Sequence, residues 1–130
     1  MKKITSIIAL LVLAGSLCFT ACAGSKAGVQ TISGEKAERF AARPSVVVLD
    51  VRTPAEYAAG HLPNAVNIDF LARGFEAQVS QLDKNKSYLV YCKSGNRSTK
   101  AVAVMEANGF KKLFNLAGGI TGWQGAVTNH

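Results

Sequence analysis

Residues 46–60 read VVVLDVRTPAEYAAG, and within this stretch a strand pattern gives way to a helix pattern. The first four residues are wholly apolar and mostly β-branched, which is typical of a strand buried on both faces of a parallel sheet. Thr53 can cap a helix, Pro54 suits its first position, and Glu56 completes a capping box with Thr53. Gly60 can end that helix in a left-handed conformation. The stretch therefore predicts a buried strand followed directly by a short helix.

The same alternation continues along the chain. Further elements are predicted as strands at residues 29–32, 65–68, 88–91 and 113–116, and as helices at residues 35–42, near 75–82 and from Ser98 to the Asn108-Gly109 break. Strands that alternate with helices indicate an α/β fold, with a mainly parallel open sheet flanked by helices on both faces. In such sheets the functional residues lie at the carboxyl ends of the strands, so Asp50, Arg52 and Cys92 are the first candidates.

Composition restricts the class of protein. The chain has 130 residues, of which 48% are hydrophobic, so it holds one domain with an adequate core. Its 3 cysteines are too few for a disulfide-stapled scaffold. The 15 basic and 8 acidic residues give a net charge of +7, but the basic residues are dispersed, with no run longer than Lys111-Lys112. This pattern favours attraction of small anions and predicts no nucleic-acid partner.

The N-terminus has the features of an export signal. Lys2 and Lys3 precede an apolar stretch at residues 4–19, which is shorter than the about 20 residues that a membrane span needs. Small residues follow this stretch. We therefore predict a signal peptide at residues 1–21, a flexible tether at residues 22–28 and the folded domain at residues 29–127.

Two cleavage sites compete. Residues 19–22 (FTAC) resemble the lipoprotein box of bacteria, in which Cys22 carries the lipid and attaches the protein to a membrane of the cell envelope. A cut after Ala23 would instead give a soluble periplasmic protein, and an uncut segment would be a permanent anchor helix. We expect the lipoprotein. Either cut leaves Cys92 as the one thiol of the folded domain, in an oxidising compartment where a lone thiol needs a reason.

Residues 92–98 read CKSGNRS and join a predicted buried strand to a helix N-terminus. Backbone N–H groups of such a turn can converge on one point, and Gly95 allows the φ angle that this requires. Together with the helix dipole they favour an anion, so we expect the pKa of the Cys92 thiol to be lowered. Lys93 and Arg97 add positive charge that can receive a dianionic substrate. A thiol that is already ionised needs no histidine beside it as a general base.

Three motifs resemble those of the rhodanese domain family. Residues 49–65 (LDVRTPAEYAAGHLPNA) resemble its first signature, residues 92–98 its active-site loop, and residues 116–123 (LAGGITGW) its closing motif. They occur in order and span nearly the whole mature chain. The most similar type is the small, single-domain, exported thiosulfate sulfurtransferase of the phage-shock kind. The resemblance implies a rhodanese-like fold.

The resemblance also implies sulfur transfer. Cys92 would take the outer sulfur of thiosulfate, or of another small anionic donor, as a persulfide and pass it to cyanide or a small thiol. The persulfide and the donor would be bound by Lys93, Ser94, Gly95, Asn96, Arg97 and Ser98, with Asp50 and Arg52 in support. No cofactor is implied, and no group of His, Cys and carboxylate residues has the spacing of a metal site.

Other interpretations stay open. Cys92 could be an inert core cysteine, and Asp50 and Arg52 could be catalytic, although we expect them to brace the loops as an ion pair. We expect His61 to be a hydrogen-bonded structural residue. Phosphatases and arsenate reductases of related fold use a loop that resembles Cys, five residues, Arg, whereas four residues separate Cys92 from Arg97. A non-catalytic sulfur-relay or binding module is the remaining alternative.

Overall fold

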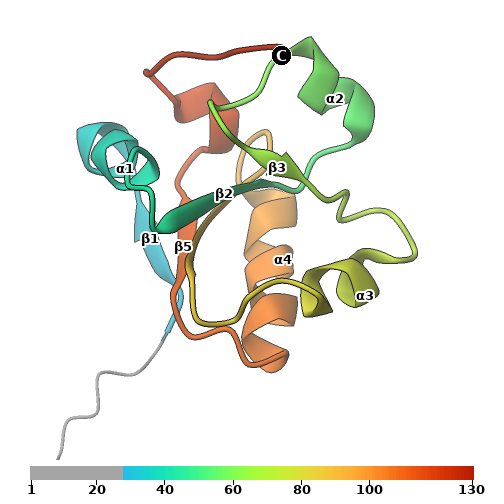
Figure 1. The fold of residues 1–130 in the computed structure, drawn as a ribbon. Coiled ribbons are helices and arrows are strands. Elements are labelled where there is room, and N and C mark those ends of the chain that lie inside the picture. Colours follow the sequence, from blue (N-terminus) through green and yellow to red (C-terminus); the bar gives the residue numbers. More distant parts are fainter. Residues whose placement is uncertain (1–27) are drawn as a thin grey trace, which may run out of the picture.

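A computed structural model describes residues 28–130 of the chain (Figure 1). The predicted signal peptide, the tether up to residue 27 and Cys22 lie outside the described residues, so these predictions stay untested. The elements are β1 (Gln30–Ile32), α1 (Gly34–Ala41), β2 (Val46–Asp50), α2 (Pro54–Ala59), β3 (Val66–Asn67), α3 (Phe75–Ser80), β4 (Ser87–Tyr91), α4 (Asn96–Ala107), β5 (Leu113–Leu116) and the 3₁₀ helix η1 (Gly119–Gly122).

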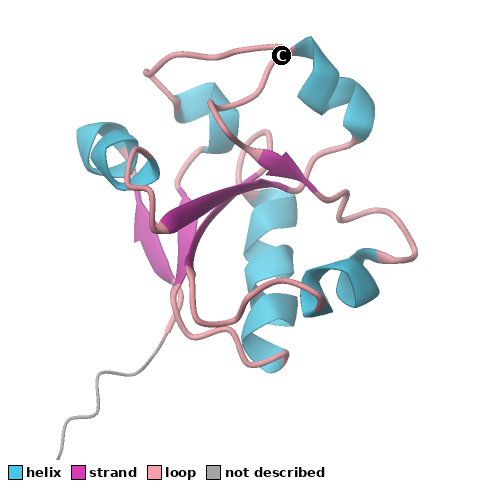
Figure 2. Ribbon diagram, viewed as in Figure 1, coloured by secondary structure: helices cyan, strands magenta, loops and turns pink. Residues whose placement is uncertain are grey.

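The five strands form one parallel sheet in the order β1-β5-β4-β2-β3. Helices cover both faces of the sheet, and successive side chains of a strand point to opposite faces, so each strand contributes to two buried clusters. In β4, Tyr88 and Val90 pack with α3 and α4, whereas Leu89 and Tyr91 pack on the other face with α1 and η1. The predicted parallel α/β sheet with helices on both faces is therefore confirmed (Figure 2).

Local sequence explains α2, which lies next to the candidate site. The Thr53 hydroxyl accepts the Glu56 N–H at 3.3 Å and the Glu56 carboxylate accepts the Thr53 N–H at 3.0 Å, so the predicted capping box forms. The expectation of a left-handed Gly60 is wrong. Its φ of 154° is positive, as only glycine readily adopts, but its ψ of 134° lies far from the left-handed helical region, and the next residue, His61, pairs with Thr128 in an antiparallel bridge.

The parallel direction of all five strands gives the sheet two chemically different edges. Cys92 and the Asp50–Arg52 segment follow β4 and β2 at the carboxyl edge, as predicted. The turn before β4 and the loop before β5 lie at the amino edge, where the described part of the chain also begins (Figure 1). Within residues 28–130, no helix is long and apolar enough to cross a membrane.

Candidate active site

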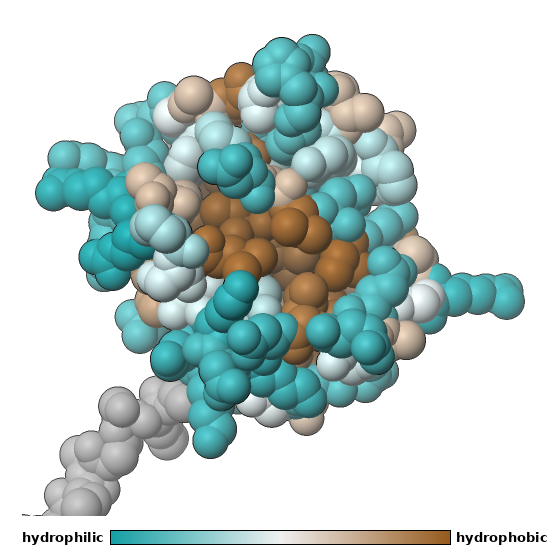
Figure 3. Space-filling view, in the orientation of Figure 1, coloured by the Kyte–Doolittle hydropathy of each residue, from teal (hydrophilic) through white to brown (hydrophobic). Residues whose placement is uncertain are grey.

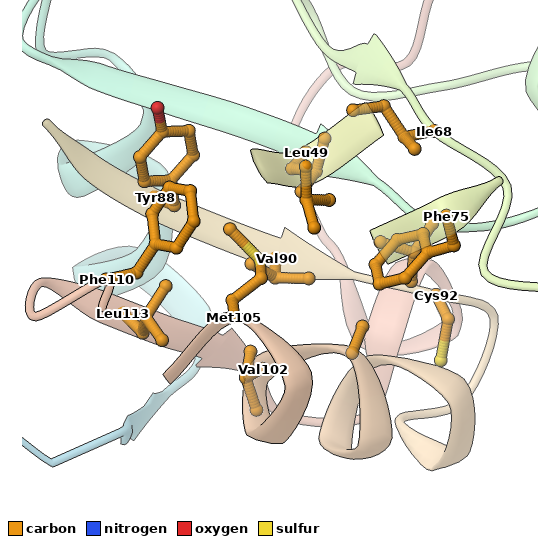
Figure 4. Close-up of a cluster of buried hydrophobic side chains, with 13 residues drawn as sticks. Leu49, Ile68, Phe75, Tyr88, Val90, Cys92, Val102, Met105, Phe110 and Leu113 are labelled. Carbon is orange, nitrogen blue, oxygen red and sulfur yellow. The ribbon is translucent and has the colours of Figure 1, made fainter. Parts of the chain in front are cut away.

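Cys92 follows β4 directly and lies in a loop that leads into α4. Its side chain is only 1% exposed, and Figure 4 shows the sulfur at the margin of the apolar core, beside the first turn of α4. Gly95 precedes the helix with φ 110° and ψ −10°, a conformation that strains any residue with a Cβ. The Gly95 N–H donates to the Cys92 sulfur over 3.0 Å. The loop thus aims a backbone donor at a buried sulfur.

These contacts favour the ionised form of the thiol. Burial is the largest single influence and opposes ionisation, but hydrogen bonds from the Ser98 side chain and from the N–H groups of Ser98, Gly95 and Ser94 outweigh it. The pKa of the Cys92 thiol is therefore lowered from its ordinary value. Ser98 Oγ lies 3.4 Å from the sulfur, so the thiol donates to this hydroxyl, and the hydroxyl can donate in return once the sulfur is ionised.

The 3₁₀ helix η1 holds the loop from its other side. The Ile120 N–H donates to the Cys92 carbonyl over 2.9 Å, and the Thr121 N–H and hydroxyl donate to the Lys93 carbonyl over 3.1 and 2.7 Å. Gly119 has φ 57°, and a Cβ added there would lie 2.4 Å from the Cys92 carbonyl oxygen. Only glycine allows η1 to pack this closely against the cysteine loop, so the motif at residues 116–123 holds that loop in place.

Arg97 forms a bidentate ion pair with Glu56, which sequence reasoning did not predict. Its two terminal nitrogens donate to the two carboxylate oxygens over 2.8 and 2.9 Å. These hydrogen bonds lower the pKa of Glu56 from 4.5 to about 2 and raise that of Arg97. From the sequence, Arg97 was expected to bind the donor, and Glu56 was expected only to form the capping box. The structure shows that the guanidinium ties the cysteine loop to α2, and its contact with a donor stays a prediction.

The remaining residues of the loop differ in their exposure to solvent. Lys93, Ser94 and Asn96 are exposed and free to meet a molecule from solvent, Gly95 is half-buried, and Ser98 is buried against the sulfur. The loop therefore combines a buried sulfur with polar residues that are exposed to solvent. The assignment of the exposed residues to donor binding remains a prediction.

Asp50 and Arg52 form a buried brace behind the loops. The Arg52 side chain donates to both oxygens of Asp50, with the shortest contact at 2.7 Å, and the Tyr91 hydroxyl donates to the same carboxylate at 2.7 Å. Burial and this hydrogen bond raise the pKa of Tyr91 above its ordinary value. Arg52 also donates to the Gly60 carbonyl at 2.7 Å. The carboxylate is thus satisfied by structural partners, which favours bracing over catalysis.

The other candidate residues have structural surroundings. His61 is 2% exposed, its Nδ1 lies 2.8 Å from the Tyr57 carbonyl, and its ring stacks on Tyr57. In the part of the chain that the structure describes, Cys92 is the free cysteine, and no three His, Cys, Asp or Glu side chains are placed to hold a metal ion. The chemistry of this edge therefore centres on a single activated sulfur.

Comparisons with known proteins agree with this geometry. The family profile of the rhodanese-like domain matches residues 33–126. A sulfurtransferase of Allochromatium vinosum is 35% identical over 86 residues, which is 66% of this chain and 78% of that protein. A tRNA uridine(34) hydroxylase of Buchnera aphidicola is 38% identical over 85 residues, which is 61% of this chain but only 27% of that protein.

A solved structure has the same fold over the whole domain. The crystal structure of a rhodanese-related protein from Thermoplasma volcanium matches with a TM-score of 0.67 and 29% identity, and the match covers 78% of this chain and 99% of that one. The match of the family profile spans strands β2 to β5 and both loops that hold Cys92 in place, and it begins just after β1. On the evidence of profile, relatives and fold, the chain belongs to the rhodanese-like domain family.

Proposed function

We propose that this rhodanese-like domain is a thiosulfate sulfurtransferase that works through a persulfide on Cys92. The observation that carries the proposal is the buried Cys92 sulfur, which accepts the Gly95 N–H at 3.0 Å and has a lowered thiol pKa. A thiolate is the reactive form of cysteine. The relationship to a protein named sulfurtransferase supports the same class of reaction.

The reaction has two displacement steps and needs no external oxidant or reductant. The Cys92 thiolate attacks the outer sulfur of thiosulfate, so the Sγ–S bond forms while the S–S bond of thiosulfate breaks, and sulfite leaves with the electron pair. An acceptor thiolate, or cyanide, then attacks the terminal sulfur of the persulfide and releases Cys92 as a thiolate. The loop N–H groups face the anionic sulfur in the resting state and after the first step.

The loop favours sulfur over a tetrahedral oxyanion. Four residues separate Cys92 from Arg97, whereas the loop of phosphatases and arsenate reductases of related fold resembles Cys, five residues, Arg. The Arg97 guanidinium also donates two of its hydrogen bonds to Glu56. An oxyanion site would need that guanidinium for its own charge. These two features support a sulfur donor as substrate and oppose the phosphatase alternative.

The cell envelope is the proposed place of this reaction, with Cys22 as the lipidated residue. The basic start, the apolar stretch at residues 4–19 and the FTAC box support this proposal. Lipid attachment would hold the domain at a membrane surface, whereas cleavage after Ala23 would release it into the periplasm. Mass spectrometry of the mature N-terminus distinguishes the two forms.

Intact mass after thiosulfate treatment tests the chemistry. We expect the wild-type chain to gain the mass of one sulfur atom, to lose it again on addition of cyanide or a small thiol, and to turn over repeatedly. Cys92→Ser is the control: the hydroxyl is close in shape but forms no persulfide, so the mass gain should vanish while the circular dichroism spectrum persists. A single loading without turnover would favour the relay module. Absence of loading in the wild type would refute sulfur transfer from thiosulfate.

A further inference from the structure

The amino edge of the sheet carries a cluster of lysines that the reaction does not use. Lys84 and Lys86 lie in the turn before β4, and Lys111 and Lys112 lie in the loop before β5. In sequence these pairs are far apart and look dispersed. The fold joins them, because β4 and β5 are neighbours and Tyr88 pairs with Leu113.

Direct contacts place the two lysine pairs side by side. The Lys112 ammonium donates to the Asn85 carbonyl over 3.3 Å, and the Lys84 ammonium lies 5.8 Å from the centre of the Phe110 ring. All four lysines are exposed, and within residues 28–130 none of them is in an ion pair. We call these four lysines the basic edge.

Acidic residues near the basic edge cancel only part of its charge. Asp83 lies in the same turn, accepts the Asn85 N–H over 2.9 Å and offsets one of the positive charges. Glu106 lies in the last turn of α4, and Glu76 accepts from Asn108 just beyond that helix. Arg43, which precedes β2 at the same edge, adds a further positive charge. The surface thus remains positive, and Figure 3 shows hydrophilic side chains around the point where the described chain begins.

The chain enters the domain at this same edge. Gln30, the first residue of β1, pairs with Phe114 of β5, which lies two residues after Lys112, so the chain enters the domain close to the basic edge. Cys22 is six residues before residue 28, and the seven residues 22–28 span at most about 25 Å when extended. A lipid on Cys22 would therefore keep the basic edge close to a bilayer. The Cys92 loop lies at the opposite, carboxyl edge of the sheet.

We propose that the basic edge docks on the anionic headgroups of a phospholipid bilayer and turns the Cys92 loop away from it. Lysines near an anionic membrane contribute additively to binding, and that attraction is screened by salt. Docking would add an electrostatic contact on the same side of the domain as the lipid. This inference goes beyond sulfur transfer, and its test uses no measurement of activity.

Vesicle binding tests the proposal on the full chain made without lipid by Cys22→Ser. Vesicles of neutral phosphatidylcholine measure the contribution of the apolar N-terminal stretch, and vesicles with added phosphatidylglycerol measure the contribution of charge. We expect at least about tenfold tighter binding to the anionic vesicles at low salt. Most of this preference should be lost in the variant Lys84→Gln, Lys86→Gln, Lys111→Gln, Lys112→Gln, and what remains is the contribution of Lys2, Lys3 and the other basic residues.

A matched variant removes the same charge elsewhere. Arg73→Gln, Lys100→Gln removes two exposed charges away from the basic edge and from Arg43; compared with Lys84→Gln, Lys112→Gln, it should keep the preference for anionic vesicles. Circular dichroism confirms the fold of both variants. Equal loss in the two variants, or no preference in the parent chain, would overturn the proposal. Tighter binding to a single-stranded oligonucleotide than to anionic vesicles would also overturn it and indicate a nucleic-acid surface instead.

Discussion

Gly119→Ala tests whether the closing motif positions the cysteine loop. A Cβ at Gly119 would lie 2.4 Å from the Cys92 carbonyl oxygen and 2.5 Å from the Lys93 carbonyl oxygen. Both atoms belong to the backbone and cannot turn aside as a flexible side chain can. The substitution must therefore push the cysteine loop away from η1 or distort η1 itself.

Gly118→Ala is the matched control for this change. Gly118 also has a positive φ, 71°, but its added Cβ would meet nothing nearer than Gly122 Cα at 3.6 Å. An alanine in the left-handed conformation costs about 1–2 kcal/mol at either position. Gly119→Ala additionally disrupts the three hydrogen bonds from Ile120 and Thr121 to the loop, each worth about 1 kcal/mol.

We expect Gly119→Ala to lower the free energy of unfolding by about 4–5 kcal/mol, against about 1–2 kcal/mol for Gly118→Ala. Urea unfolding followed by circular dichroism measures this difference. The rate of persulfide formation, measured by intact mass after mixing with thiosulfate, should fall roughly hundredfold in Gly119→Ala, because the sulfur and its donors are misplaced. It should change little in Gly118→Ala. Equal stability and equal rates in the two variants would refute the positioning role of Gly119.

Three further substitutions test the charges and donors of the site. Glu56→Gln should lower the free energy of unfolding by about 1–2 kcal/mol at neutral pH, after allowance for partial exposure. Because the pKa of Glu56 is lowered to about 2, this stabilisation is complete above about pH 4.5 and is lost as the pH falls toward 2. The urea midpoints of variant and wild type should therefore converge in acid. Ser98→Ala removes a hydrogen bond that lowers the Cys92 pKa, so the acid limb of the rate of persulfide formation should move to higher pH; an unmoved profile would contradict this role. Lys93→Ala should raise KM for thiosulfate more than it lowers kcat, and an equal fall of kcat and kcat/KM would show that Lys93 acts in the transition state instead.

Most of the fold was predictable because its signals are local. The apolar run of β2 and the capping box of Thr53 and Glu56 each occupy a few consecutive residues, and both form as expected. The position of Cys92 at a strand end was predictable for the same reason. Gly60 was the exception, since its conformation depends on pairing of its neighbour with Thr128 near the C-terminus.

The parts of the site that sequence reasoning missed depend on contacts between distant residues. Arg97 and Glu56 are separated by 41 positions, and nothing in either motif indicates that the two side chains meet. The same limit applies to the basic edge, where Lys84 and Lys112 come together only through the pairing of β4 with β5. Charge that is dispersed along the sequence can be concentrated by the fold, and only the strand order reveals where.

The arrangement around Cys92 explains how the pKa of a buried thiol can be lowered. Burial alone raises the pKa of a thiol. A nearby lysine would lower that pKa again, but its own charge would then lose contact with water. Here the offset comes from backbone N–H groups and the Ser98 hydroxyl, which carry no net charge and are fixed by Gly95 and the start of α4. Charged side chains are therefore left for other tasks: Arg97 anchors the loop to Glu56, and Lys93 stays exposed to solvent. Stabilisation of the sulfur anion and attraction of the donor should for this reason be separable by mutation, with Ser98 governing the first and Lys93 the second.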